Sequence, residues 1–152
     1  MPEEQETLLP SGGALLSIEA AGGADIPAFT LVVQIPEPMA LVSPSTGFLA
    51  SEPDDEDMDV SWVAGTGDAV LVTFTPLTSS FQTAAGTGLV CAVEGDPGEM
   101  TIPAAALQAI TTDGNSSVAL GVTRVKGASA EAGPWIVPAS VTRSTGGLLK
   151  LK

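Results

Sequence analysis

The sequence predicts an all-β fold, and three observations support that prediction. Val, Leu, Ile and Ala dominate an apolar fraction of 44%, whereas aromatic residues make up only 4%. Tyr is absent, and 17 Gly and 12 Pro residues, together with many Ser and Thr, interrupt the chain every few residues. Short β-branched segments between turn residues are typical of antiparallel sandwiches and barrels. We therefore expect a single antiparallel β-sandwich, Ig-like, with about nine strands and one short helix near residues 103–110.

The first half of the chain contains four predicted strands, each bounded by turn residues. The cleanest is 28–35, where every second side chain is large and apolar until Pro36, which cannot donate to a central β-ladder. A long loop, 43–59, precedes the third strand, and loops of this length in compact domains are commonly functional or mobile. The four strands are expected at residues 14–20, 28–35, 59–63 and 69–75.

The second half contains five predicted strands and the only helix signal. Pro103 stands first in an Ala-rich segment and Gly114 lies beyond its end, which is typical of a short helix. In the longest strand, Arg124 and Lys126 continue the apolar face of Val118, and we expect them to emerge past the edge of the core. The five strands are expected at residues 88–94, 99–102, 116–126, 135–143 and 147–152.

One domain should span residues 1–152, because a chain of this length buries enough surface to need no disulfide or metal. Residues 1–6 are polar and are expected to be disordered. The single cysteine, Cys91, excludes an internal disulfide and is expected to be a buried structural residue. The predicted core consists of Phe29, Leu31, Val33, Trp62, Val70, Val72, Phe74, Leu89, Cys91, Val93, Leu107, Val118, Leu120 and Val122.

The charge distribution excludes several functions. The formal net charge is −13, and no Lys or Arg precedes Arg124. Nucleic-acid binding needs clustered cations to neutralise phosphates, so we expect no nucleic-acid partner. Binding to anionic lipid is disfavoured for the same reason, and no apolar segment approaches the length of a membrane span, so we expect no direct membrane insertion of this domain.

The residue types needed for common catalysis are missing. The chain has no His, which removes the commonest general base and the commonest nucleophile partner. Neither G-x-S-x-G nor S-x-x-K occurs, and the three lysines lie near the C-terminus. Two Trp and no Tyr offer few platforms for a sugar substrate. We therefore expect that the protein is not an enzyme.

An acidic loop, residues 52–59, is the one candidate metal site. Hard cations such as Ca²⁺ take several oxygen ligands, which a flexible loop can supply. The loop lacks the central Gly and distal Glu of an EF-hand, and a solvated run of charges is the favoured explanation, with calcium binding as the alternative. The candidate calcium ligands are Asp54, Asp55, Asp57 and Asp59.

The basic residues allow a second hypothesis. Arg124 with Lys126, and Lys150 with Lys152, each share a strand face by a period of two. If these strands lie together, they form a basic stripe that could contact the acidic loop of a neighbouring copy and build a charge-driven assembly. The alternative is charge compensation between neighbouring strands of a monomer.

Four segments cover about half the chain and occur in this order: GGADIPAFTLVVQIPEP (22–38), DMDVSWVAGTGDAVLVTFTP (57–76), LVCAVEGDPGEMTIPAAALQAI (89–110) and VALGVTRV (118–125). This series resembles a soluble β-sandwich domain of uncharacterised secreted and outer-membrane lipoproteins of myxobacteria and related bacteria. In such proteins a signal peptide and a lipidated cysteine precede the domain. The resemblance implies an extracytoplasmic location, in the periplasm or on the outer-membrane surface, with the native signal peptide trimmed. It implies no catalytic residue.

These observations predict a non-catalytic extracytoplasmic surface or periplasmic domain with a structural or binding role. The partner would be a protein or a glycan at the cell surface, bound by the loops 43–59 and 77–87 near exposed aromatic residues such as Phe48, Phe81 or Trp135. One alternative is a calcium-stabilised adhesion or recognition module that uses the acidic loop, and another is a self-assembling structural subunit. No cofactor other than calcium is expected.

Overall fold

The computed structural model describes residues 12–45, 50–78, 80–84, 88–111 and 117–152. The described chain is mostly β-strand with one short helix, so the predicted all-β class is confirmed. The helix, α1 (Ala104–Thr111), lies where Pro103 and the alanines predicted it. Residues 1–6, which we expected to be disordered, lie outside the described residues.

The strand count and several strand ends differ from the prediction. Ten strands are present among the described residues, because the long loop contains or borders two short strands that we did not predict. The last two predicted strands form one continuous strand, and the strand before them runs six residues beyond Lys126. The strands are β1 (Leu15–Ala20), β2 (Phe29–Gln34), β3 (Leu41–Ser43), β4 (Ala50–Glu52), β5 (Met58–Trp62), β6 (Ala69–Pro76), β7 (Leu89–Glu94), β8 (Glu99–Ile102), β9 (Ser117–Ala132) and β10 (Trp135–Leu151).

The strands form three sheets, so the single Ig-like sandwich with nine strands is not confirmed. A five-stranded sheet has the order β4-β10-β9-β6-β7, a three-stranded sheet has the order β3-β5-β8, and β1 pairs with β2. All these pairings are antiparallel except that between β4 and β10. The difference arises because β9 and β10 are far longer than one sandwich layer requires.

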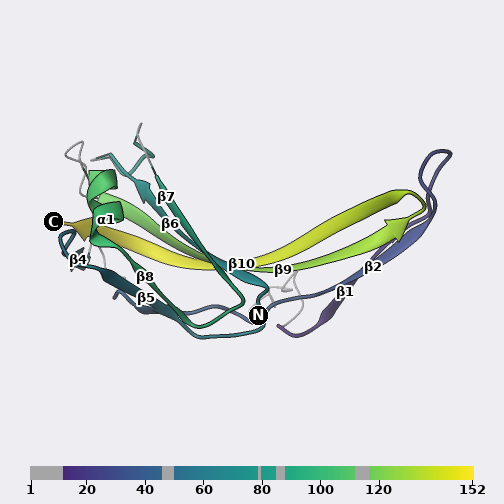
Figure 1. Cartoon of the computed structure of the whole chain (residues 1–152), viewed down its shortest axis with the longest axis horizontal. Coiled ribbons are helices and arrows are strands. Elements are labelled where there is room, and N and C mark those ends of the chain that lie inside the picture. Colours follow the sequence, from purple (N-terminus) through teal and green to yellow (C-terminus); the bar gives the residue numbers. More distant parts are fainter. Residues whose placement is uncertain (1–11, 46–49, 79, 85–87, 112–116) are drawn as a thin grey trace, which may run out of the picture.

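The long β9–β10 hairpin gives the molecule two parts (Figure 1). At one end its strands join β4, β6 and β7, and this sheet lies beside β5, β8 and α1; we call this part the body. At the other end the hairpin extends beyond the five-stranded sheet, and β1 and β2 lie beside it. Of these two strands, β2 contacts β9. We call this part the arm. The strands β9 and β10 pair in one continuous register from the turn of the arm to the C-terminal end of the body.

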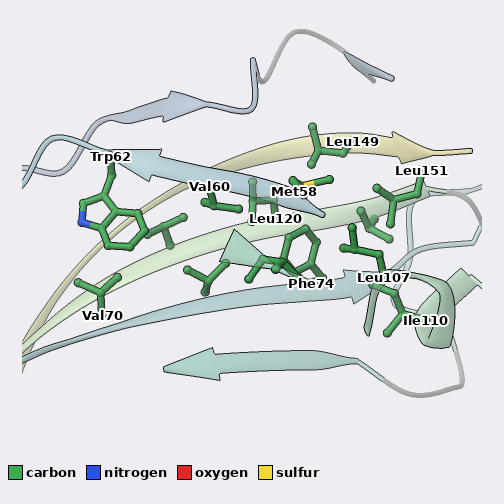
Figure 2. Close-up of a cluster of buried hydrophobic side chains, with 14 residues drawn as sticks. Met58, Val60, Trp62, Val70, Phe74, Leu107, Ile110, Leu120, Leu149 and Leu151 are labelled. Carbon is green, nitrogen blue, oxygen red and sulfur yellow. The ribbon is translucent and has the colours of Figure 1, made fainter. Parts of the chain in front are cut away.

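The main hydrophobic core lies in the body, between the three-stranded and five-stranded sheets (Figure 2). Eight of the predicted core residues belong to it, including Trp62, Phe74 and Leu107. Three others, on β7, are only partly buried because β7 is the outer strand of its sheet. The predicted core list lacked contributions from β5, β8, α1 and the end of β10, namely Met58, Val60, Ile102, Ile110, Leu149 and Leu151.

A smaller buried set holds the arm together. Leu31 and Val33, both predicted as core, are 2% exposed, and Ile35 continues their face of β2. Because β2 contacts β9, these side chains face the arm half of the hairpin. Phe29, also predicted as core, is only half-buried, since it lies at the end of β2 near the arm tip. The arm therefore has its own packing, separate from the main core.

Candidate functional site

A fully buried arginine lies where the arm meets the body. Arg124, on β9, is 0% exposed and continues the inward face that Val122 occupies in the core. Its Nε donates to the Asp96 carboxylate in the turn between β7 and β8. Its two terminal nitrogens donate to the carbonyl oxygens of Glu37, at 2.8 Å, and of Val63, at 2.6 Å. One guanidinium thus connects β9 with three separate connecting segments.

The Asp96 carboxylate, like Arg124, is buried and held by several hydrogen bonds. Its side chain is 2% exposed, and its Oδ1 accepts a hydrogen bond of 2.7 Å from the indole nitrogen of Trp62. Burial by itself would raise the pKa of Asp96, but the hydrogen bonds from Trp62 and Arg124 outweigh burial and lower the pKa below its ordinary value. Asp96 therefore stays ionised at neutral pH and completes a buried ion pair.

Two glycines make room for the guanidinium. A Cβ on Gly65 would stand 2.6 Å from the central guanidinium carbon of Arg124, and a Cβ on Gly67 would stand 2.8 Å from its Cγ. The turn between β5 and β6 consequently lies against the arginine side chain, and only glycine allows that approach. The AGTGD turn that the sequence shows is therefore part of the packing around Arg124.

The expectation that Arg124 emerges past the core was wrong, because Asp96, Trp62 and the two carbonyls extend the buried region beyond the apolar residues. The predicted basic stripe is not formed either. Lys126 faces Val141 in the ladder, whereas Lys150 faces Ser117, about nine residues or roughly 30 Å further along β9. Lys126 instead pairs with Asp68. Charge compensation between neighbouring segments is thus what the structure shows for Arg124 and Lys126.

Asp68 is the exposed counterpart of Asp96. It accepts hydrogen bonds from Lys126 and from the backbone N–H of Gly127, the latter at 2.8 Å. These two donors, Lys126 first, lower the pKa of Asp68 below its ordinary value. The pair is half-exposed, so solvent screens it and its contribution to stability is small.

The two aspartates predict how stability depends on pH. An aspartate whose pKa is lower in the folded state adds stability that is complete above its ordinary pKa, about 3.9, and is lost as the pH falls through the folded value. We expect the difference in unfolding free energy between the wild type and Asp96→Asn to be constant from pH 7 to about pH 4 and to shrink below that. Urea unfolding at each pH measures it. A difference that widens on acidification would contradict the ion-pair assignment, and Asp68→Asn should show the same trend at smaller size.

The acidic loop lies against helix α1 and β8. The backbone N–H of Ala104 donates to Asp57 at 2.9 Å, and the hydroxyl of Thr111, at the last helical residue, donates to Asp54 at 3.0 Å. Asp57 therefore satisfies a free N–H at the start of the helix. Asp59 accepts a hydrogen bond of 2.7 Å from the Thr101 hydroxyl on β8, and Asp55 is exposed.

The proposed calcium ligands are thus held by different protein donors. Asp57 and Asp59 line one pocket of about 230 Å³, together with Glu52 and Glu56, whereas Asp54 and Asp55 do not line it. Within the described part of the chain, no three Asp, Glu, Cys or His side chains form a group that could hold a metal ion. Contacts with α1 for Asp54 and Asp57, and with β8 for Asp59, give three of the four aspartates a structural role.

The tip of the arm carries three exposed large apolar side chains. Trp135 and Ile136, the first residues of β10, are 54% and 73% exposed, and Ile26 in the loop between β1 and β2 is 44% exposed. The two loops lie side by side in Figure 1, and a Cβ on Gly133 would stand 3.1 Å from the ring of Pro27. Trp135 is therefore exposed, as the sequence suggested.

Two hollows flank Phe29 at this tip. One has a volume of about 500 Å³ and is lined by residues 20–26 and Phe29. The other, of about 490 Å³, is lined by Ala20, Ala21, Ala28, Phe29, Glu19 and Thr30. Their size is in the range of small-ligand or side-chain pockets, but both are open to solvent. The tip therefore offers a contact surface with shallow hollows.

The other surfaces expected to bind a partner are less developed. Phe48 lies outside the described residues, as do residues 46–49, 79 and 85–87 of the two predicted binding loops. Phe81 is 46% exposed and has a positive φ of 59°, and the other exposed aromatic residue in the described ranges, Trp135, lies on the arm. Sequence reasoning placed the binding surface in these loops because loops commonly carry binding residues. The arm was not foreseen, because no pattern in the sequence indicated that β9 and β10 continue beyond the body.

Among the helical residues of the described chain, none form a segment with the length and apolar character of a membrane span. No protein-family model, curated protein or solved structure matches this chain.

Proposed function

We propose that this protein is a non-catalytic extracytoplasmic domain, at the cell surface or in the periplasm, that binds a partner through the tip of its arm. The observation that carries the proposal is the exposure of Trp135, Ile136 and Ile26 at the end of a projecting hairpin. Solvent-exposed tryptophan and large aliphatic side chains are typical centres of binding energy in protein interfaces. A rigid arm holds them away from the body.

The titratable groups support a role without catalysis. General acids and bases work best when their pKa lies near the working pH. The aspartates that the structure perturbs, Asp68 and Asp96, have a lowered pKa because they accept hydrogen bonds from cations and N–H groups. Burial raises the pKa of the Cys91 thiol, which makes it a poorer nucleophile at neutral pH. These shifts stabilise structural contacts and do not prepare a group for proton transfer.

The location is proposed from the sequence. The resemblance to secreted and outer-membrane lipoproteins of myxobacteria supports an extracytoplasmic domain, and the strongly acidic composition favours solubility. An arm that projects from a compact body is well suited to reach a partner from an anchored position. The partner classes that follow are surface proteins and glycans.

The test is binding to isolated bacterial envelope fragments. We expect the fluorescently labelled protein to bind such fragments saturably, and Trp135→Ser with Ile136→Ser to weaken binding at least about tenfold, since interface anchors commonly contribute 2 kcal/mol or more. The matched control is Val42→Ser with Val90→Ser, which removes two body residues that are 63% and 67% exposed. Protease treatment of the fragments separates a protein partner from a glycan. The proposal fails if binding is not saturable or if both double variants bind equally.

A further inference from the structure

We infer that the free edge of β1 binds the same edge of a second copy of this chain, so that two arms join into one four-stranded sheet. This interface is separate from the tip residues of the proposed function and does not depend on them. Among the described strands, β1 pairs with β2 alone. Its other edge therefore offers backbone N–H and C=O groups that a further strand can bind.

The register of β1 and β2 identifies the backbone groups at this edge. The N–H of Ile35 donates to the carbonyl oxygen of Ala14 at 2.8 Å, just before the first pair of the ladder. Facing residues in an antiparallel ladder alternate between hydrogen-bonded and non-hydrogen-bonded pairs, so the even-numbered residues of β1 bond to β2. The backbone groups of Leu15, Ser17 and Glu19 consequently point to the free edge.

These three residues complement themselves in an antiparallel arrangement. When Ser17 faces Ser17 of the second copy, Leu15 of each copy faces Glu19 of the other, and every outward group finds a partner. The two Glu19 carboxylates then lie roughly 13 Å apart along the strands. On the other face of the sheet, Leu16 of each copy faces Ile18 of the other. A shift in register would move Leu15 or Glu19 past the end of the partner strand.

The side chains of β1 leave this edge unprotected. Leu15 and Ile18 are 70% and 40% exposed on opposite faces of the strand, and Val32, which faces Ser17 on β2, is 48% exposed. Proteins commonly protect a free edge with lysine, proline or a bulge. The strand β1 contains neither Lys nor Pro, and its pairing with β2 is regular. Added pairing would also stabilise a sheet that has only two strands.

The other free edges of the described strands are less suited to pairing. β10 contains Pro138 and Arg143 along its outer edge, and the outer edge of β9 in the arm uses the N–H of Gly127 to bind Asp68. β3, β4 and β8 have only three or four residues each. β7 ends in Glu94 and lies on the body, where most of the described carboxylates are found.

The charge distribution permits contact between two arms. In the described arm segments, 12–36 and 126–143, the carboxylates are Glu19, Asp25 and Glu131, whereas the whole chain has 18 acidic residues. Because β1 runs along the arm toward the tip, antiparallel pairing directs the two bodies to opposite ends (Figure 1). Salt ions screen the repulsion that remains. Added salt therefore strengthens this dimer, whereas it would weaken an assembly held by opposite charges.

The first experiment measures the mean mass of the whole chain by sedimentation equilibrium, up to about 1 mM protein, because an interface of one strand edge is small and weak. We expect the mass to rise from monomer toward dimer, and more steeply at about 0.5 M salt. Ser17→Pro removes an outward N–H without touching the bonds to β2, and should weaken dimerisation at least about tenfold. The matched control is Ser129→Pro, because the N–H of Ser129, like that of Gly127, points away from β10. It should leave dimerisation unchanged.

The second experiment tests the register by disulfide formation with oxidised glutathione, in chains that also carry Cys91→Ala. Ser17→Cys should cross-link two copies readily, because the Cα atoms of a hydrogen-bonded pair are about 5.5 Å apart, within the range of a disulfide. Leu15→Cys should cross-link at least about tenfold more slowly, because its two copies lie roughly 13 Å apart.

Three outcomes would overturn the inference. They are a monomer throughout the concentration range, equal dimerisation of Ser17→Pro and the wild type, and equal cross-linking of Ser17→Cys and Leu15→Cys. The tip variant, Trp135→Ser with Ile136→Ser, should dimerise like the wild type. If that variant loses envelope binding and no dimer forms in either protein, the proposed function stands and only the pairing of β1 falls.

Discussion

Replacing Arg124 with methionine should lower the free energy of unfolding by about 3–5 kcal/mol, because breaking a buried ion pair leaves its partner charged and desolvated. The Asp96 carboxylate would keep the hydrogen bond from the Trp62 indole but lose its cation. The carbonyl oxygens of Glu37 and Val63 would each lose a hydrogen-bond donor. Such a loss is a large part of the total stability of an ordinary domain. Urea unfolding at neutral pH, with an unchanged m-value, measures it.

Lys126→Met is the matched control. It removes a cation two residues along the same face of β9, but its ion pair with Asp68 is half-exposed, so the expected change is below about 1 kcal/mol. Arg124→Lys tests the geometry, because lysine keeps the charge but cannot direct three nitrogens to three acceptors. Similar effects of Arg124→Met and Lys126→Met would show that Arg124 does not hold the junction.

Gly146→Ala should destabilise the protein by about 1–3 kcal/mol, toward the upper end of the usual range for overpacking. A Cβ on Gly146 would stand 2.1 Å from the carbonyl oxygen of Leu120 and 3.2 Å from the Cα of Gly121 on the neighbouring strand. Both obstacles are backbone atoms, which cannot move aside as a flexible side chain can. The ladder would have to open locally, and the midpoint of urea unfolding should fall accordingly.

Gly23→Ala is the control for this substitution. Nothing lies within 4 Å of a Cβ at Gly23, and its φ is not in the left-handed region. A surface change of this kind usually stays within about 0.5 kcal/mol. If Gly146→Ala is as mild as Gly23→Ala, then β9 and β10 are further apart at this point than the structure has them.

The local pattern predicted the class of fold and most of the main core. Alternation in β6 and β9 identified Val70, Val72 and Val122 as core residues, since one face of each strand is fully buried. The short helix followed from Pro103 and the alanines. These features depend on residues that are close together in the sequence, so the sequence pattern alone is enough to predict them.

The features that the sequence did not predict depend on contacts between distant segments. Residues 144–146 were predicted to separate two strands, but β10 passes through them, and Gly146 pairs with Gly121 at close approach. Arg124 reads as an exposed residue at the end of a strand, although alternation placed it on the inward face. Its partners, Asp96 and the carbonyls of Glu37 and Val63, come from three other parts of the chain, and nothing local indicates that they converge.

In the candidate site, too, the local pattern predicted some features, whereas others depend on contacts between distant segments. Trp135 was named as an exposed aromatic residue, but the β1–β2 loop with Ile26 comes beside the β9–β10 turn only through the folding of two separate hairpins into one tip. The acidic loop was conspicuous as a run of charges. Its contacts with Ala104, Thr101 and Thr111 could not be anticipated, because they require the positions of α1 and β8.

The unbroken pairing of β9 and β10 has a mechanical consequence. A partner that pulls on the tip along the arm loads two strands that run straight into the five-stranded sheet, with no linker that could extend first. Tension is then spread over many backbone hydrogen bonds at once, rather than breaking them one by one. The hairpin can therefore act as a stiff rod that carries force from a distant attachment into the densest part of the molecule.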